Sequence, residues 1–140
     1  IHLPVAPKCN MHCNYCLRKY SCVNESRPGV VARVMVPEDA VEWYLQMKAK
    51  VPKLTVAGIA GRGDALANWK TVSRTLSMIR EVDKDVFFCL STNGLYLPKY
   101  AKEIAALGVD YVTVTVNAIT SNTGAHIYSF INDFSFIVFP

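Results

Sequence analysis

The chain has 140 residues, a formal net charge of +4 and 51% hydrophobic residues. This length suits one hydrophobic core but is short for a complete α/β barrel of roughly 250 residues. The basic residues are scattered and form no nucleic-acid stripe, and no apolar run reaches the length of a membrane span.

Strand and helix patterns alternate along the chain. In chain order we expect strands at 3–6, 54–60, 86–90 and 109–116, and helices at 37–50, 66–82 and 98–107. Pro37 and Pro98 open two of the helices, and Gly108 closes the last one as a C-cap. Strand–helix units of this length imply parallel strands joined by right-handed crossovers. The sequence therefore predicts an α/β fold with about four βα units of a partial, truncated (β/α) barrel.

Three cysteines, Cys9, Cys13 and Cys16, follow the first predicted strand with the spacing C-x3-C-x2-C. Because 4Fe-4S clusters are usually held by four thiolates, a compact triplet leaves one iron open to another ligand. A structural zinc site is the alternative, since Cys13 and Cys16 form a common zinc pair with His12 and Cys22 nearby. The odd number of cysteines and the lack of a secretory signal argue against a disulfide framework, and we expect a reducing cytoplasm.

Polar segments follow the other predicted strands. These segments contain the candidate cofactor-binding residues Gly61, Gly63, Asp64, Ser91, Asn93 and Asn117. Parallel α/β folds place their sites in the loops at the carboxyl ends of strands, so we expect these residues near the cysteines. The glycines would let main-chain amides approach a ligand, and Asp64 would accept hydrogen bonds from an ammonium or a ribose. Ordinary turn chemistry is the alternative for each segment.

Several stretches of the chain together resemble the radical SAM (S-adenosylmethionine) superfamily and, within it, the NifB family of nitrogenase cofactor maturases. The stretches are His2–Asn10, Cys22–Gly29, Gly58–Gly61, Leu90–Gly94, Val112–Ala118 and Gly124–Tyr128. The resemblance implies that SAM binds the open iron and is cleaved reductively. It also implies that a methyl group and then a carbide reach iron–sulfur material, and that two 4Fe-4S clusters fuse into an eight-iron precursor.

The resemblance implies roles for individual residues as well. It assigns the cysteine triplet to the SAM-binding cluster. It assigns His2, Cys22 and Cys89 to a second 4Fe-4S cluster, which is one of the two substrate clusters, and it makes Glu25 and Arg27 candidate catalytic residues. From the residues alone, these five positions read as a strand histidine, a loop thiol, a core cysteine and a surface ion pair. The implied partners are SAM, iron–sulfur cluster donors and nitrogenase cofactor carrier proteins, with no nucleic acid and no membrane.

The sequence departs from this family in two places. Arg62 and Ala65 stand where the family usually has prolines, and after about Ser129 the pattern gives way to an apolar tail rich in phenylalanine. We therefore expect a partial radical SAM domain at 1–128 and an atypical tail at 129–140, from a truncated or frameshifted gene; a genuine terminal strand would also be apolar. Two other functions stay open: a different radical SAM enzyme, and a non-catalytic iron–sulfur or zinc carrier.

Overall fold

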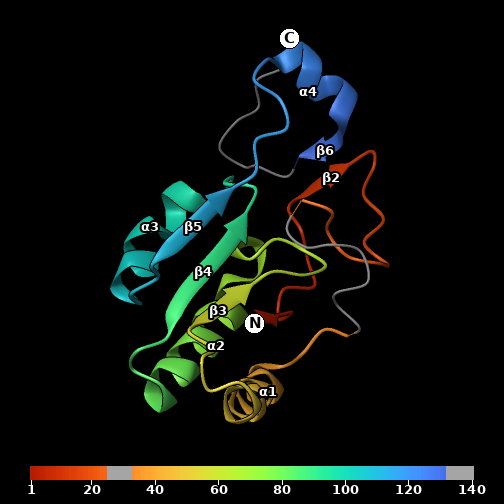
Figure 1. Ribbon diagram of the computed structural model, residues 1–140. Helices are drawn as coiled ribbons and strands as arrows, with labels where there is room; N and C mark the ends of the chain where they lie inside the picture. Colours follow the sequence, from red (N-terminus) through yellow and green to blue (C-terminus); the bar gives the residue numbers. More distant parts are fainter. Residues whose placement is uncertain (25–32, 132–140) are drawn as a thin grey trace.

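A parallel four-stranded sheet forms the centre of the molecule in a computed structural model that describes residues 1–24 and 33–131 (Figure 1). Its strands, in sheet order, are β1 (His2–Leu3), β3 (Val56–Ile59), β4 (Phe87–Thr92) and β5 (Tyr111–Val114). Every neighbouring pair is parallel. The predicted α/β class with parallel strands is confirmed, and within the described residues the sheet is open at β1 and β5 and does not close into a barrel.

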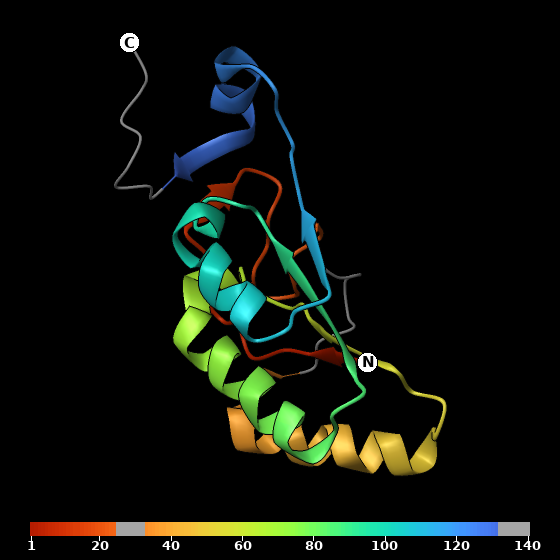
Figure 2. The ribbon, with the colours of Figure 1, turned by 90° about the vertical axis from the view of Figure 1, so that its left-hand side faces the viewer.

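Three helices connect these strands: α1 (Pro37–Lys50), α2 (Trp69–Val82) and α3 (Leu97–Ala106). Each new strand is added on the same side of the previous one, so right-handed crossovers bring all three helices to one face of the sheet (Figure 2). Pro37 lies in the first turn of α1, as expected, and the acidic Glu38 and Asp39 follow it, where they complement the helix dipole. Gly108 has φ +67°, the left-handed conformation that a C-cap glycine adopts after α3.

The hydrophobic core lies between the sheet and these helices. Helix α2 contributes Val72, Leu76 and Ile79, which share one face of the helix at helical spacing. Phe88 and Leu90 of β4 are fully buried against them. Because alternate strand residues face opposite sides of a sheet, the residues between them belong to the helix-free face.

The strand ends differ from the sequence expectations for local reasons. β1 ends at Leu3 because Pro4 has no N–H for a ladder, whereas we expected a strand to residue 6. β4 continues through Ser91 and Thr92, which we expected in a loop, because β5 provides partners for both residues. A short 3-10 turn, η1 (Leu66–Asn68), precedes α2 where one continuous helix was expected.

A second, antiparallel pair of strands was not expected at all. Strand β2 (Met11–Cys13) lies inside the cysteine segment and pairs with β6 (Tyr128–Ile131), which follows the short helix α4 (Ser121–Ile127) (Figure 1). The predicted boundary at residue 129 falls within β6, and the rest of the predicted tail lies outside the described residues.

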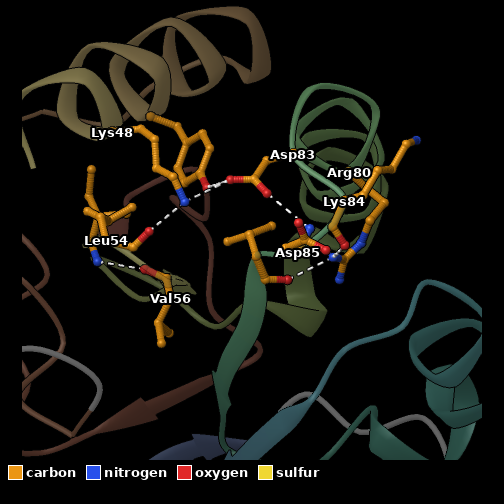
Figure 3. Close-up of polar contacts among 10 residues, drawn as sticks. Lys48, Leu54, Val56, Arg80, Asp83, Lys84 and Asp85 are labelled. Carbon is orange, nitrogen blue, oxygen red and sulfur yellow. Dashed lines mark hydrogen bonds and ion pairs between the residues drawn. The ribbon is translucent and has the colours of Figure 1, made fainter. Parts of the chain in front are cut away.

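Helices α1 and α2 are joined by a polar contact at their carboxyl ends. Asp83, the residue after α2, accepts a hydrogen bond of 2.6 Å from the Tyr44 hydroxyl and pairs with Lys48 at 3.0 Å (Figure 3). Lys48 also donates to the Leu54 carbonyl, so the charge pair ties α1 to the segment before β3. These bonds hold the pKa of Asp83 down, at about 2, against a smaller opposing effect of burial. Burial and the bond to Asp83 raise the pKa of Tyr44.

Candidate functional site

The cysteine triplet lines a pocket at the carboxyl ends of the parallel strands. The pocket residues come from the cysteine segment and from the loops after β3, β4 and β5: Cys9, Met11, Cys13, Cys16, Arg18, Cys22, Asn24, Arg62, Asn93, Thr115 and Asn117. The placement agrees with the expectation that residues after successive parallel strands meet at one edge of the sheet. Four of the five cysteines of the chain therefore share one pocket.

The β2–β6 pair holds the middle cysteine of the triplet. Cys13 ends β2 and is buried, and burial raises the pKa of its thiol. The next residue, Asn14, donates its backbone N–H to the Ile127 carbonyl and its side-chain amide to the His126 carbonyl, both at 2.8 Å. Cys16 turns back with a backbone bond of 2.9 Å to Cys13. The carboxyl-terminal part of the described chain thus fixes the backbone around the cysteines.

The loop after β3 supports the cysteine segment from the other side. The Gly61 carbonyl accepts the backbone N–H of Cys22 at 2.9 Å, and the backbone N–H of Asp64 donates to the Lys8 carbonyl at 2.9 Å. A Cβ at Gly63 would lie 2.0 Å from that carbonyl oxygen, so only glycine permits this approach. Gly61 and Gly63 are therefore close to the cysteine segment and contact its main chain, and their predicted approach to a ligand stays a prediction.

Asp64 joins the loops after β3 and β4. Its side chain is buried, with one oxygen accepting the backbone N–H groups of Leu66 and Ala67 at 2.8 and 3.2 Å. The other oxygen accepts the Thr92 hydroxyl at 2.9 Å and the Asn93 backbone N–H at 2.6 Å. Four hydrogen bonds from the protein fill the main acceptor positions of this carboxylate. These bonds favour a structural role for Asp64, and its predicted contact with a ligand stays a prediction.

His2 and Cys89 lie in one row across the helix-free face of the sheet. His2 is in register with Gly58, and Gly58 is in register with Cys89. The side chains of His2 and Cys89 therefore lie on either side of a residue that has no side chain. Two strand spacings separate them, or about 10 Å. β1 begins at His2, and in the parallel pairing His2 lies beside Gly58, the third residue of β3. Burial, with a smaller effect of the amino-terminal charge, lowers the pKa of His2.

The structure divides the predicted second ligand set. Cys22 lines the pocket of the triplet, whereas His2 and Cys89 are outside the residues that line it. Ser91 is two residues after Cys89 on the same face and also lies outside the pocket, while Asn93 and Asn117 line it. The two candidate catalytic residues, Glu25 and Arg27, fall outside the described residues.

The site also includes residues outside the predicted set of site residues. Arg18 and Arg62 also line the pocket, and the Arg18 guanidinium donates to the Met11 carbonyl at 2.6 Å. Asn10 is buried, and its side-chain Nδ2 has no hydrogen-bond partner within the described part of the chain. Asn10 lies within the cysteine motif and Arg18 lies two residues after it, but only the tertiary contacts distinguish them from other polar residues nearby.

The residues of the pocket fit an iron–sulfur cluster. Within residues 1–24 and 33–131, no three His, Cys, Asp or Glu side chains are placed to hold a single metal ion. A 4Fe-4S cluster binds each thiolate at a different iron, so its ligands do not have to meet at one point. Several sulfur donors around one pocket, with two arginines among the lining residues, suit such an anionic group. Cys9, Cys13 and Cys16 would hold it.

Comparison with known proteins defines the class of this chain. A family model described as the radical SAM superfamily matches residues 3–133, and the chain belongs to that superfamily. It is also similar to the FeMo cofactor biosynthesis protein NifB from several bacteria. The NifB of Bradyrhizobium diazoefficiens is 50% identical over 131 residues, which cover 94% of this chain and 26% of that relative.

Two further NifB proteins have similar sequence identity to this chain and similar coverage. That of Klebsiella pneumoniae is 50% identical over 131 residues, with 94% of this chain and 28% of the relative covered. That of Azotobacter vinelandii is 48% identical over 128 residues, with coverages of 91% and 26%. The chain thus spans about a quarter of the length of these relatives.

In the described residues, no helix is both long enough and apolar enough to cross a membrane.

Proposed function

We propose that this chain is the SAM-binding part of a NifB-like enzyme that builds an iron–sulfur precursor of the nitrogenase cofactor. The observation that supports it most directly is the pocket shared by Cys9, Cys13 and Cys16 at the carboxyl ends of the sheet. The identity of about one residue in two to NifB proteins supports the choice within the superfamily. The open sheet would then be part of a larger barrel.

The pocket residues would prepare the site for SAM. When bound, a 4Fe-4S cluster with an open iron supplies the electron for reductive cleavage of SAM. Arg18 and Arg62 offset negative charge in the pocket, and Arg62 adds a guanidinium where the family usually has proline. Asn117 and Thr115 follow β5 and line the same pocket, and their polar groups would orient the amino, carboxylate or ribose groups of SAM. Ser91 lies outside this pocket, on the adjacent helix-free face, and its part in SAM binding stays a prediction.

The substrate would be iron–sulfur material bound on the adjacent helix-free face. His2 and Cys89 flank Gly58 there, and the missing side chain of Gly58 lets the His2 imidazole lie over it, 3.3 Å from where a Cβ would be. Cys22 would contribute from the neighbouring pocket. Cluster donors would deliver this material, and carrier proteins of the nitrogenase cofactor would accept the product.

A segment exchange tests this proposal in the context of a full-length relative. The matching segment of the Klebsiella pneumoniae NifB is replaced by residues 1–131 of this chain in a strain that lacks its own NifB. We expect nitrogenase activity to return, and to be lost again when the exchanged segment carries Cys9→Ala. An exchanged protein that accumulates, binds iron and responds to SAM without restoring nitrogenase activity would indicate another radical SAM reaction. One that binds iron without a SAM response would indicate a cluster carrier.

A further inference from the structure

The side chain of Asn93 connects the Asp64 network to the first cysteine of the triplet. Its Nδ2 donates to the Asn10 side-chain oxygen at 2.6 Å and lies 3.8 Å from the Cys9 sulfur. The second distance is long, as expected for a hydrogen bond to sulfur, which is larger than oxygen. Asn93 also lines the pocket of the triplet, so its amide lies between the protein interior and the proposed cluster.

The surrounding hydrogen bonds determine which end of the Asn93 amide faces Cys9. The Asn93 Oδ1 accepts the backbone N–H of Leu95 at 3.0 Å, and a rotated amide would place its NH2 group against that donor. The NH2 group therefore faces Asn10 and Cys9. A donor, and not an acceptor, points at the sulfur.

Asp64 fixes the position of Asn93 itself. The 2.6 Å bond from the Asn93 backbone N–H ends on a buried carboxylate that also holds the Thr92 hydroxyl. The loop after β3, which carries Asp64, is attached to the cysteine segment, because the Asp64 backbone N–H donates to the Lys8 carbonyl. The donor and the thiol thus belong to one hydrogen-bonded unit, which limits changes in the distance between them.

We propose that the Asn93 amide sets the reduction potential of the cluster bound through Cys9, with Asp64 as the residue that positions it. This inference rests on the proposed function, because it requires Cys9 to bind the cluster. Reduction adds negative charge to the cluster and its thiolates, and a hydrogen bond to a ligating sulfur stabilises the more negative state. The Asn93 donor therefore raises the potential at which the cluster accepts an electron.

The buried amide of Asn10 supports the same assignment. Its oxygen accepts from Asn93, while its own Nδ2 is buried without a partner in the described residues. Burying an amide donor without a hydrogen bond is unfavourable, so this donor, in the residue next to Cys9 in the chain, is suited to an acceptor that the described residues do not supply. Thiolate and sulfide sulfur are such acceptors.

The test is an EPR-monitored redox titration of the anaerobically reconstituted 140-residue chain. The titration follows the reduced-cluster signal that changes when SAM is added, since that signal reports the cluster with an open iron. We expect Asn93→Leu, which removes the donor without adding charge, to lower the ratio of reduced to oxidised cluster about tenfold at the wild-type midpoint. For a one-electron couple this corresponds to a midpoint lowered by about 59 mV.

Asn93→Asp provides a second variant, because it keeps the acceptor for Leu95 and replaces only the donor. This variant also adds a negative charge to the pocket. Asn117→Asp is the control for that effect, because it places the same charge in the same pocket. We expect the shift in Asn93→Asp to exceed the shift in Asn117→Asp. Iron content and far-UV circular dichroism are measured for every variant to show that cluster and fold are retained.

The outcomes separate this inference from the proposed function. A wild-type chain without a SAM-responsive signal contradicts the proposed function. A SAM-responsive wild type whose midpoint is unchanged in Asn93→Leu, or moved no further in Asn93→Asp than in Asn117→Asp, overturns the inference alone. Loss of iron from both Asn93 variants also overturns it, because Asn93 would then be needed for assembly of the site.

Discussion

The α-carbon of Gly63 lies against the main chain of Lys8, the residue directly before the first cysteine of the motif. A Cβ added at Gly63 would lie 2.0 Å from the Lys8 carbonyl oxygen and 2.5 Å from its carbonyl carbon. Both atoms belong to the backbone, so a side-chain rotation cannot relieve the overlap. The cysteine segment would have to move away from the loop after β3.

Gly63→Ala should therefore destabilise the chain by about 1–3 kcal/mol, the usual range for overpacking. Because the displaced segment carries Cys9, the variant should also retain less iron after reconstitution. Urea unfolding and iron analysis measure the two effects. Gly124→Ala is the control, since its Cβ would meet no atom closer than 3.8 Å and a helical glycine is replaced. Equal stability of the two variants would contradict the close contact.

The triplet cysteines should determine the response to SAM. We expect anaerobic reconstitution to give an oxygen-sensitive brown protein whose reduced-cluster EPR signal changes on addition of SAM. Cys9→Ala, Cys13→Ala and Cys16→Ala should each abolish this change, because each removes one thiolate of a three-thiolate site. Cys89→Ala, outside the pocket, serves as the control and should keep the response. Stoichiometric zinc and no iron in the wild type would support the zinc alternative instead.

His2, Cys22 and Cys89 should bind a second four-iron cluster. We expect roughly eight irons per chain in the reconstituted wild type and about half of that in Cys22→Ala or Cys89→Ala, with SAM binding intact. Because Cys22 shares the triplet pocket and Cys89 does not, the comparison of these two variants is informative. A wild-type iron content near four that is unchanged in both variants would show that neither cysteine holds a cluster.

The Asp83 contact should make part of the stability depend on pH. The folded pKa of Asp83 is lowered, chiefly by the hydrogen bond from Tyr44, from 3.8 to about 2. A lowered carboxyl pKa contributes stability above the unfolded value, and that contribution is lost as pH falls through the folded value. Asp83→Asn should therefore cost about 1–2 kcal/mol at pH 7 and progressively less between pH 4 and pH 2.

Urea unfolding at several pH values measures this difference. Asp39→Asn is the control, because Asp39 pairs with Arg33 on the surface, where ion pairs contribute little. A constant difference between wild type and Asp83→Asn from pH 7 to pH 2 would contradict the role given to the Asp83 carboxylate.

Local sequence patterns were sufficient to predict the order of the main helices and strands and the parallel sheet. They also predicted that the cysteine triplet follows the first strand. Apolar residues at helical spacing on α2 and the alternating burial along β4 are properties of short windows, and both were confirmed. The position of the triplet after a strand also predicted that it lies at the edge of the sheet where the carboxyl ends of the strands meet, because parallel strands end together.

Only the tertiary structure decided how the cysteine segment is held. His12 and Ser129 are 117 positions apart, yet their side chains are 2.8 Å apart in the β2–β6 pair. The four bonds to Asp64 and the placement of Cys22 with the triplet likewise depend on how separate loops pack. Such contacts leave no periodicity in the sequence, because each is a single pairing between distant residues whose geometry is set by the packed sheet and helices.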